Sequence, residues 1–353
     1  MKLSDFDYEL PKELIAQEPL NQRDHSKLMV VQKENKIHHK HFYNITDYFN
    51  KGDVLVINNT KVLPYKFHGN KSTGGKVELV LGNRLSIKQY EARIKSTKTQ
   101  LGDRIIIKPK IQDDKSHPEK IIQCKVLSKN EDIFTIEFDK EYNIEELRSF
   151  GELPLPPYIV DYKGDQNKYQ TIYSEYKLNS KNQGSLAAPT AGLHFTDELL
   201  NKLREIGVKI VTICLHVSFG TFKYIKDEDI EKHTMDPEYY IIEKEAANTI
   251  NNCSGNLFVV GTTTLKTLET ASDEKGYVIS GEGWSDLFIY PGYEFKFKHK
   301  IHGFLTNFHL PKSSLLMLLS AYWGRKEILE VYKVAVDEKY RFFSFGDAML
   351  LSI

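Results

Sequence analysis

The 353-residue chain has little cysteine and no long apolar run. Its three cysteines, Cys124, Cys214 and Cys253, are far apart and form no CxxC pair. This spacing argues against a disulfide framework and against a zinc site, and it is typical of proteins in a reducing compartment. No apolar run approaches the ~18 residues of a membrane-spanning helix, and acidic residues stand where a signal peptide would have its apolar core. We therefore expect a cytoplasmic protein with neither membrane contact nor metal.

The chain also lacks net charge, since 48 basic and 48 acidic side chains balance. Whole-chain charge thus does not indicate a nucleic-acid partner, for which phosphate contacts dominate affinity. The distribution is uneven, however, because eight basic residues and only two acidic ones stand between Arg84 and Lys110. This segment could hold a phosphate backbone, although solvated lysines on exposed strand faces explain it equally well.

Sequence signatures of several enzyme classes are absent as well. No GxGxxG fingerprint occurs, so a dinucleotide cofactor has no support. No GxSxG elbow occurs, which leaves Ser/His/Asp hydrolase chemistry without its signature. The alternating histidines of HHKH (His38 to His41) lack neighbours that would complete a metal coordination sphere. We interpret that segment as a strand.

Residues 66–150 contain short, β-branched segments separated by turns, such as GKVELVL and IFTIEF. Many short strands at close spacing are typical of a small barrel. The clustered prolines of GELPLPPYI (151–159) then mark a boundary. Outside this insertion, strands alternate with helices. The pattern predicts an α/β domain, 1–65 and 151–353, with a mostly parallel sheet flanked by helices and an inserted β-barrel domain at 66–150.

Individual elements of the α/β domain can be placed from the same pattern. A helix is expected at 197–206, stopped by Gly207, and further helices near 243–253 and 263–271 and in SSLLMLLSAYW. The expected strands are KLMVVQ, KIHHKHFY, GDVLVINNT, VKIVTICLHV, LFVVG, SDLFIYPG and GFLTNFHLP.

Polar residues recur where these strands end and these helices begin. They are Asn58, Asn59 and Thr60; His216; Gly261, Thr262 and Thr263; and Asn307, His309 and Lys312. The carboxyl ends of parallel strands meet at one edge of an open sheet, where ligands bind. Backbone amides and hydroxyls at helix starts can receive an anionic group there. A plain threonine N-cap, or an asparagine that caps a loop, is the competing interpretation.

The turn AAPTAGLHFT (187–196) adds Thr190, Gly192 and His194 to this group. Thr196 is expected to cap the helix that follows. A lone histidine in such a turn is usually structural, but His194, His216 and His309 could share one crevice, and imidazole titrates near neutral pH. From these residues alone a plain turn is the better interpretation of PTAGLH, and a substrate pocket is the alternative.

Several of these segments carry a family resemblance. They include RDHSKLMV, VLVINNTKVLP, GELPLPPYI, GSLAAPTAGLHFT, VGTTTLKTLE, LTNFHLPKSSLLMLLSA and YRFFSFGDAML. In order from Leu3 to Leu350, the chain closely resembles the S-adenosylmethionine:tRNA ribosyltransferase-isomerases of the queuosine pathway. Local departures are the longer segment SEYKLNSKNQ (174–183), Tyr90 in place of an expected tryptophan, and the idiosyncratic segment 111–120.

The resemblance implies a fold, a reaction and its partners. The fold is an α/β domain with an inserted β-barrel. S-adenosylmethionine is consumed as a substrate, and no cofactor is used. Its ribosyl part moves onto 7-aminomethyl-7-deazaguanine at the wobble position of a tRNA with a GUN anticodon and is rearranged, giving epoxyqueuosine, adenine and methionine. The resemblance also implies a monomer.

This reaction needs a base for the ribose C5′ proton, an acid for the leaving adenine and donors for the methionine carboxylate. With this resemblance we interpret PTAGLH as a turn that shapes a substrate pocket, and we assign His194 as the base, with His216 and His309 as rivals for either proton-transfer role. The methionine end could be held by Thr190, Gly192, Thr262 and Thr263. Base stacking could use Trp284, Tyr290 or Phe308, and Asp286 or Glu269 could pair with cations or act as acids. Roles in the core or on the surface compete for each of these residues.

Two other functions remain open at the sequence level. A methyltransferase that uses S-adenosylmethionine on RNA would need a glycine-rich loop after its first strand, and none is found. A non-catalytic tRNA-binding protein with the basic barrel as its platform would not need histidines at sheet edges. The products formed from S-adenosylmethionine distinguish all three functions.

Overall fold

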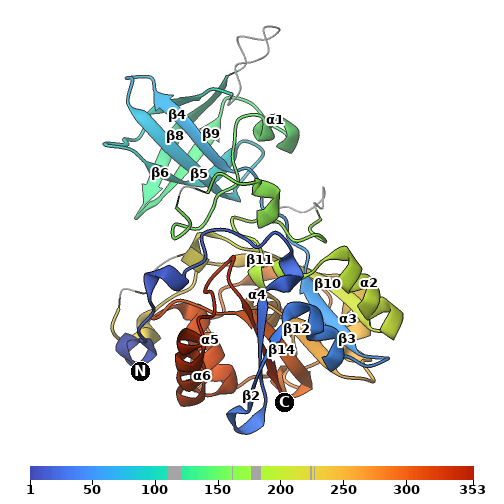
Figure 1. Ribbon diagram of the computed structural model, residues 1–353. Helices are drawn as coiled ribbons and strands as arrows, with labels where there is room; N and C mark the ends of the chain where they lie inside the picture. Colours follow the sequence, from blue (N-terminus) through green and yellow to red (C-terminus); the bar gives the residue numbers. More distant parts are fainter. Residues whose placement is uncertain (110–120, 161, 176–183, 223–224, 226) are drawn as a thin grey trace. The chain divides into compact units, whose positions relative to one another are not determined.

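The computed structural model describes residues 1–109, 121–160, 162–175, 184–222, 225 and 227–353. Two of the departures noted above, residues 111–120 and the greater part of 174–183, lie outside this description. The chain divides into two compact units. The first comprises Met1–Lys61, Pro156–Glu175 and Ala188–Ile353, and the second comprises Val62–Leu155 with residues 184–187. Both termini belong to the first unit (Figure 1).

The first unit is built on a nine-stranded sheet in the order β13-β11-β10-β3-β12-β14-β15-β1-β2 (Figure 1). The strands are β1 (Lys27–Val31), β2 (Ile37–His41), β3 (Val54–Asn58), β10 (Lys209–His216), β11 (Glu238–Ile242), β12 (Leu257–Val260), β13 (Gly281–Ser285), β14 (Ile301–Asn307) and β15 (Ala348–Ser352). The central strands β10, β3, β12 and β14 are parallel. Antiparallel pairings join β11 and β13 on one side and β15 on the other. The sheet is therefore parallel at its centre and mixed as a whole.

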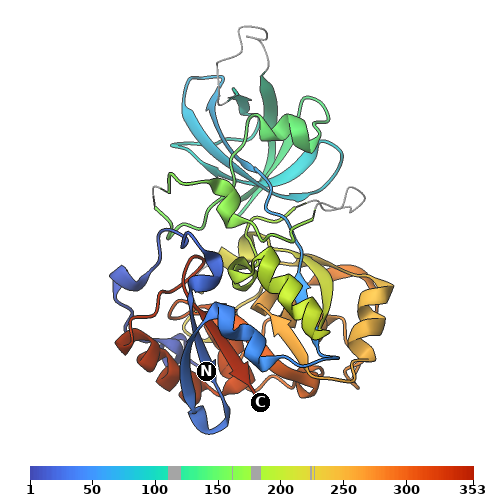
Figure 2. The ribbon, with the colours of Figure 1, turned by 45° about the vertical axis from the view of Figure 1, so that its right-hand side comes forward.

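Helices cover both faces of this sheet. Val54 and Val56 of β3 belong to one hydrophobic core, and the alternate residues Leu55 and Ile57 belong to another. The first core is covered by α3 (Lys244–Asn251), α4 (Thr262–Thr270), α5 (Ser314–Trp323) and α6 (Arg325–Asp337), and the second by α2 (Asp197–Ile206) and the 3-10 segment η5 (Phe42–Tyr48). Figure 2 shows α5 and α6 side by side, in red. The predicted α/β class is confirmed.

Helix α2 has the predicted ends. The Thr196 hydroxyl accepts a hydrogen bond from the Leu199 amide at 3.2 Å, which satisfies a free N–H of the first turn. Gly207 follows the last turn with φ of 98°, a conformation that glycine adopts without strain. Within the described part of the chain, none of the helices combines the length and apolarity needed to cross a membrane.

The second unit is a closed antiparallel barrel in the order β4-β5-β6-β9-β8-β7, as its short strands predicted. The strands are β4 (Lys66–Lys71), β5 (Lys76–Arg84), β6 (Gln89–Lys95), β7 (Arg104–Ile107), β8 (Ile122–Asn130) and β9 (Ile133–Phe138), and the short helix α1 (Ile144–Arg148) follows them. Tyr90, where the resemblance led us to expect tryptophan, is buried against Tyr65 and Phe138. In the basic segment, Arg84 forms an ion pair with Glu141 at 3.1 Å, which partly neutralises its positive charge.

One strand prediction is wrong. Residues 286–291 of SDLFIYPG form no strand, and β13 comprises the preceding Gly281–Ser285 instead. Strand β13 pairs antiparallel with β11 until Ser285 faces Glu238, the first residue of β11. The ladder cannot continue past this point, so Leu287 and Ile289 pack against the core without strand pairing. Helix α6 and strands β11 and β15 were not predicted.

Candidate active site

The predicted polar residues at the carboxyl ends of β3 and β10 form one hydrogen-bonded cluster. Asn58 is 1% exposed, and its amide nitrogen donates to the Leu215 carbonyl at 3.1 Å and to Thr263 Oγ1 at 3.2 Å. Its Oδ1 accepts from the backbone amide of Thr60 at 3.0 Å. Thr60 Oγ1 in turn lies 2.7 Å from His216 Nδ1. The sheet edge thus positions His216 through Asn58 and Thr60.

Two aromatic rings follow His216 across the neighbouring strands β11 and β13. Its ring is stacked with that of Tyr239 at a centroid distance of 6.4 Å, and Tyr239 meets Trp284 edge to face at 5.2 Å. Tyr239 is buried, whereas Trp284 is 47% exposed. An exposed indole can accept a stacked base. Trp284 therefore meets the accessibility requirement for its predicted stacking role.

His194 lies in a second cluster at the same sheet edge. It ends the 3-10 turn η7 (Thr190–His194) and is 4% exposed. Its Nδ1 lies 2.7 Å from Ser26 Oγ, and its Nε2 lies 3.3 Å from Asn307 Oδ1. The ring of Phe42 stacks on the imidazole with centroids 4.9 Å apart. Ser26 precedes β1 and Asn307 ends β14, so segments distant in sequence meet at this histidine.

Asn307 selects the tautomer of His194. The Asn307 amide nitrogen donates to the Phe343 carbonyl at 2.8 Å, so the oxygen faces His194 and can only accept. Nε2 of His194 therefore carries the proton, and Nδ1 accepts from the Ser26 hydroxyl. Burial lowers the pKa of His194 to about 4, against the opposing effect of the Asp347 carboxylate. The imidazole is neutral near pH 7, with its lone pair directed at Ser26.

Gly261 lies between the two clusters. Strand β12 separates β3 from β14, so their ends are two inter-strand spacings apart, roughly 10 Å. Gly261 follows β12 with φ of 85° and is the N-cap of α4, so no threonine caps that helix. A Cβ at Gly261 would lie 3.7 Å from Thr263 Oγ1 and 3.8 Å from Ala191 of η7. The turn η7 and the start of α4 thus flank one short stretch of the edge, where one nucleoside-sized ligand could reach both clusters.

Gly192 is needed for the packing of η7. A Cβ at this position would lie 1.9 Å from Tyr173 Oη and 3.0 Å from Thr171 Cγ2. We expect Gly192→Ala to lower the free energy of unfolding by about 1–3 kcal/mol, because the added methyl overpacks a buried turn. Tyr173→Phe removes the closest atom and should recover part of this loss in the double variant. Urea unfolding of the variants measures both effects, and an unchanged midpoint for Gly192→Ala would contradict the prediction.

The remaining candidates lie apart from these clusters. His309 is 7% exposed, its Nε2 lies 2.9 Å from Thr306 Oγ1, and burial lowers its pKa to about 3. Among the described residues, no hydrogen bond joins any two of His194, His216 and His309. The three histidines therefore occupy separate hydrogen-bonded clusters.

The other predicted residues lie elsewhere in the first unit, and several of them have partners of their own. Asn59 donates to Glu175 at 3.3 Å, and Lys312 pairs with Asp7 at 2.7 Å. Thr262 is buried in the first turn of α4, Asp286 is exposed and Tyr290 packs beside Phe288. Glu269 accepts the backbone amides of residues 296 and 297, and Phe308 is fully buried among aromatic rings. Phe308 therefore has no face open to a base.

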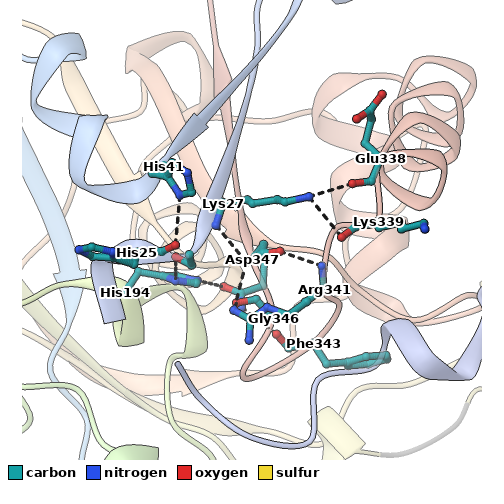
Figure 3. Close-up of polar contacts among 12 residues, drawn as sticks. His25, Lys27, His41, His194, Glu338, Lys339, Arg341, Phe343, Gly346 and Asp347 are labelled. Atoms are coloured by element: carbon teal, nitrogen blue, oxygen red, sulfur yellow. Dashed lines mark hydrogen bonds and ion pairs between the residues drawn. The ribbon is translucent and has the colours of Figure 1, made fainter. Parts of the chain in front are cut away.

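Sequence reasoning missed a small recess beside His194 that is open to solvent and encloses about 20 Å³. Its lining includes Arg23, Ser26, Lys168, His194, Arg341 and Ser344. Arg23 belongs to the 3-10 turn η3 (Arg23–His25). Figure 3 shows Arg341 paired with the buried Asp347, at 3.1 Å, close to His194. The signal in the sequence is the polar content of the segments RDHSKLMV and YRFFSFGDAML, which contribute Arg23, Ser26 and Arg341 to the lining.

Comparisons with known proteins give matches that cover nearly the whole chain. A family model described as "Queuosine biosynthesis protein" matches residues 3–351. The S-adenosylmethionine:tRNA ribosyltransferase-isomerases of Thermoanaerobacter sp. strain X514 and Acetivibrio thermocellus are each 46% identical to this chain, and the alignments cover 99% of it and 100% of each relative. The crystal structure of the S-adenosylmethionine tRNA ribosyltransferase from Thermotoga maritima is similar with a TM-score of 0.53, at 32% identity over 98% of this chain and 99% of that one.

Proposed function

The chain belongs to the queuosine biosynthesis protein family, and we propose that it transfers and isomerises the ribosyl moiety of S-adenosylmethionine onto 7-aminomethyl-7-deazaguanine at the tRNA wobble position. The products are epoxyqueuosine-tRNA, adenine and methionine. S-adenosylmethionine is consumed as a substrate, and no other cofactor takes part. The observation that carries the mechanism is the buried Ser26–His194–Asn307 arrangement at the carboxyl edge of the sheet.

His194 is the proposed base for the first step. The sulfonium of S-adenosylmethionine acidifies the ribose C5′–H, so a neutral imidazole in a desolvated site can accept this proton. The Ser26 hydroxyl relays it. The C5′ proton passes to Ser26 Oγ as the Ser26 proton passes to His194 Nδ1, which leaves an ylide next to sulfur and an imidazolium. The Asn307 oxygen, which accepts from Nε2, stabilises this imidazolium.

The His216 cluster is the proposed site for the nucleobases. His216 is only partly buried and is held by Thr60, so it is placed to protonate the leaving adenine. Trp284 is separated from His216 by the ring of Tyr239, and its exposed indole provides a stacking surface at the same sheet edge. The hydroxyl groups of Thr190 and Thr263, the latter held by the Asn58 amide, supply hydrogen bonds to the ribose between the two clusters. We propose His216 and not its rival His309 for the acid role, because burial lowers the pKa of His309 to about 3 and leaves it neutral near pH 7.

The proposal also covers the partners. The macromolecular substrate is a tRNA with a GUN anticodon, and the enzyme acts in the cytoplasm as a monomer. A zero net charge, and ion pairs such as Arg84–Glu141 and Arg93–Asp132 within the basic segment, fit a small contact area around the anticodon loop. Binding of tRNA through such a small contact releases few counterions, so the tRNA affinity depends only weakly on the salt concentration.

One assay tests the proposed function. Purified protein is incubated with S-adenosylmethionine and tRNA that carries 7-aminomethyl-7-deazaguanine. We expect free adenine and methionine, and a nucleoside with the mass of epoxyqueuosine. Release of S-adenosylhomocysteine would indicate methyl transfer instead. Binding of the tRNA without any small-molecule product would support the non-catalytic alternative.

A further inference from the structure

We propose that the recess beside His194 is a subsite for an anionic oxygen group of the substrates, either the carboxylate of the methionine part of S-adenosylmethionine or a phosphodiester of the tRNA. The inference rests on the proposed function and assigns a role to Arg23, Lys168 and Arg341, which the proposed chemistry leaves unused. These three cationic side chains line the recess together with Ser26 and His194.

Arg23 carries a desolvated charge without a carboxylate partner among the described residues. Its Nη1 donates to the carbonyls of Gln170 at 2.7 Å and Leu193 at 3.5 Å, and its Nη2 donates to that of Asn167 at 3.4 Å. Burial lowers the pKa of this guanidinium, against a weaker opposing effect of the Asp165 carboxylate. Carbonyl partners orient the side chain but do not neutralise it, so an anion in the recess gains a strong charge-assisted interaction.

Arg341 is held in place by a carboxylate outside the lining. Asp347 is 2% exposed and accepts from Arg341 Nη2 at 3.1 Å, from the Arg341 backbone amide at 2.8 Å and from that of Lys27 at 3.0 Å (Figure 3). Asp347 thus fixes the position of the Arg341 guanidinium. Among the described residues, none of the side chains that line the recess is acidic, so Arg23 and Lys168 have no carboxylate beside them in the lining. This charge imbalance favours an anionic ligand.

The size of the recess limits what it can hold. Its enclosed space is only about 20 Å³, room for one or two water-sized groups, so a single charged oxygen group fits and a larger part of a substrate does not. Because Ser26 and His194 share the lining, the bound anion would lie next to the proton-transfer pair. A negative charge there favours the imidazolium and so makes His194 a stronger base when substrate is bound.

The test uses Arg23→Gln, Lys168→Gln and the double variant of the full chain. Lys163→Gln is the matched control, since Lys163 is an exposed lysine of the same segment outside the recess. Equilibrium binding is measured separately for S-adenosylmethionine, for its decarboxylated analogue and for tRNA. We expect the double variant to bind one natural substrate at least ~10-fold more weakly, and the control variant to bind both normally.

Each outcome has a distinct meaning. If the carboxylate is the ligand, S-adenosylmethionine binding weakens while binding of the decarboxylated analogue is the same in wild type and variants. If a phosphodiester is the ligand, only tRNA binding weakens, and its logarithmic salt dependence becomes shallower by about 0.7–0.9 per lost contact. Unchanged affinity for both substrates overturns the proposal.

Two further measurements separate this inference from other effects. Arg23 also holds the carbonyls of residues 167, 170 and 193, so its replacement could weaken binding through the backbone. Lys168→Gln avoids this problem, and Arg23→Lys, which keeps the charge, should restore part of the affinity. Equal losses in Arg23→Lys and Arg23→Gln, with none in Lys168→Gln, would contradict the subsite. Binding is read without turnover, so the adenine assay on wild type tests the proposed function independently.

Discussion

His194→Gln is expected to lower turnover by ~10²-fold or more, the usual contribution of a general base, while S-adenosylmethionine binding and folding stay near those of the wild type. Glutamine can still hydrogen-bond to Ser26 and Asn307 but cannot accept the substrate proton. Adenine release under single-turnover conditions measures the loss. His216→Gln and His309→Gln are the matched variants, and turnover of His194→Gln within a few-fold of the wild type would move the role of base to another residue.

The pH dependence provides an independent check on His194. Burial lowers its pKa to about 4, so the neutral form that can accept a proton predominates above that pH. The acid limb of kcat/KM should therefore fall near pH 4 and not near the ordinary value of about 6.5 for free histidine. The limb should be lost in His194→Gln, measured against the small activity that remains. A limb centred at 6.5 that persists in this variant would indicate a different titrating group.

Lys266→Met is expected to lower the free energy of unfolding by about 3–5 kcal/mol, the cost of removing one partner from a buried ion pair. Lys266 of α4 and Glu238 of β11 are 8% and 2% exposed, and their charged atoms lie 3.1 Å apart. Glu238 also accepts the backbone amide of Ser218 at 3.1 Å, just past the end of β10. Methionine fills the space of the lysine stem but leaves the carboxylate in the interior without its cation.

The matched control for this prediction is the double variant Lys266→Met, Glu238→Gln. It removes both charges, and the glutamine oxygen can still accept the Ser218 amide, so the double variant should be more stable than Lys266→Met alone. Urea unfolding followed by far-UV circular dichroism gives the comparison. A loss below about 1 kcal/mol for Lys266→Met, as surface pairs show, would mean that the pair contributes little.

The catalytic proposal divides the edge of the sheet into two regions. The His194 cluster is proposed for the ribose C5′ and the sulfonium of S-adenosylmethionine, and the His216 cluster with Trp284 is proposed for the nucleobases. The recess beside His194 is proposed for an anionic oxygen group of a substrate. Gly261 and the turn η7 lie between them. This division predicts that His194→Gln and His216→Gln lower turnover by different amounts, since only His194 is expected to act on C5′.

Much of the fold could be predicted from local sequence. Helix α2 has its cap and its glycine stop at the predicted residues, and β3 ends in Asn58 at the predicted edge. The family prediction is confirmed by the full-length matches. The strand expected at 286–291 is wrong because strand length depends on the partner, and β11 begins opposite Ser285. An apolar segment without a partner strand packs against the core instead.

By itself the sequence determined the α/β class with its inserted barrel, the family and the placement of polar residues at strand ends, because periodicity, turn residues and motifs are local properties of the chain. Only the tertiary structure decided which groups meet. The partners of His194 are 168 and 113 residues away in the chain, at Ser26 and Asn307. Their contact, the tautomer it selects and the cationic recess beside it depend on the order of the strands in the sheet, and no local pattern specifies that order.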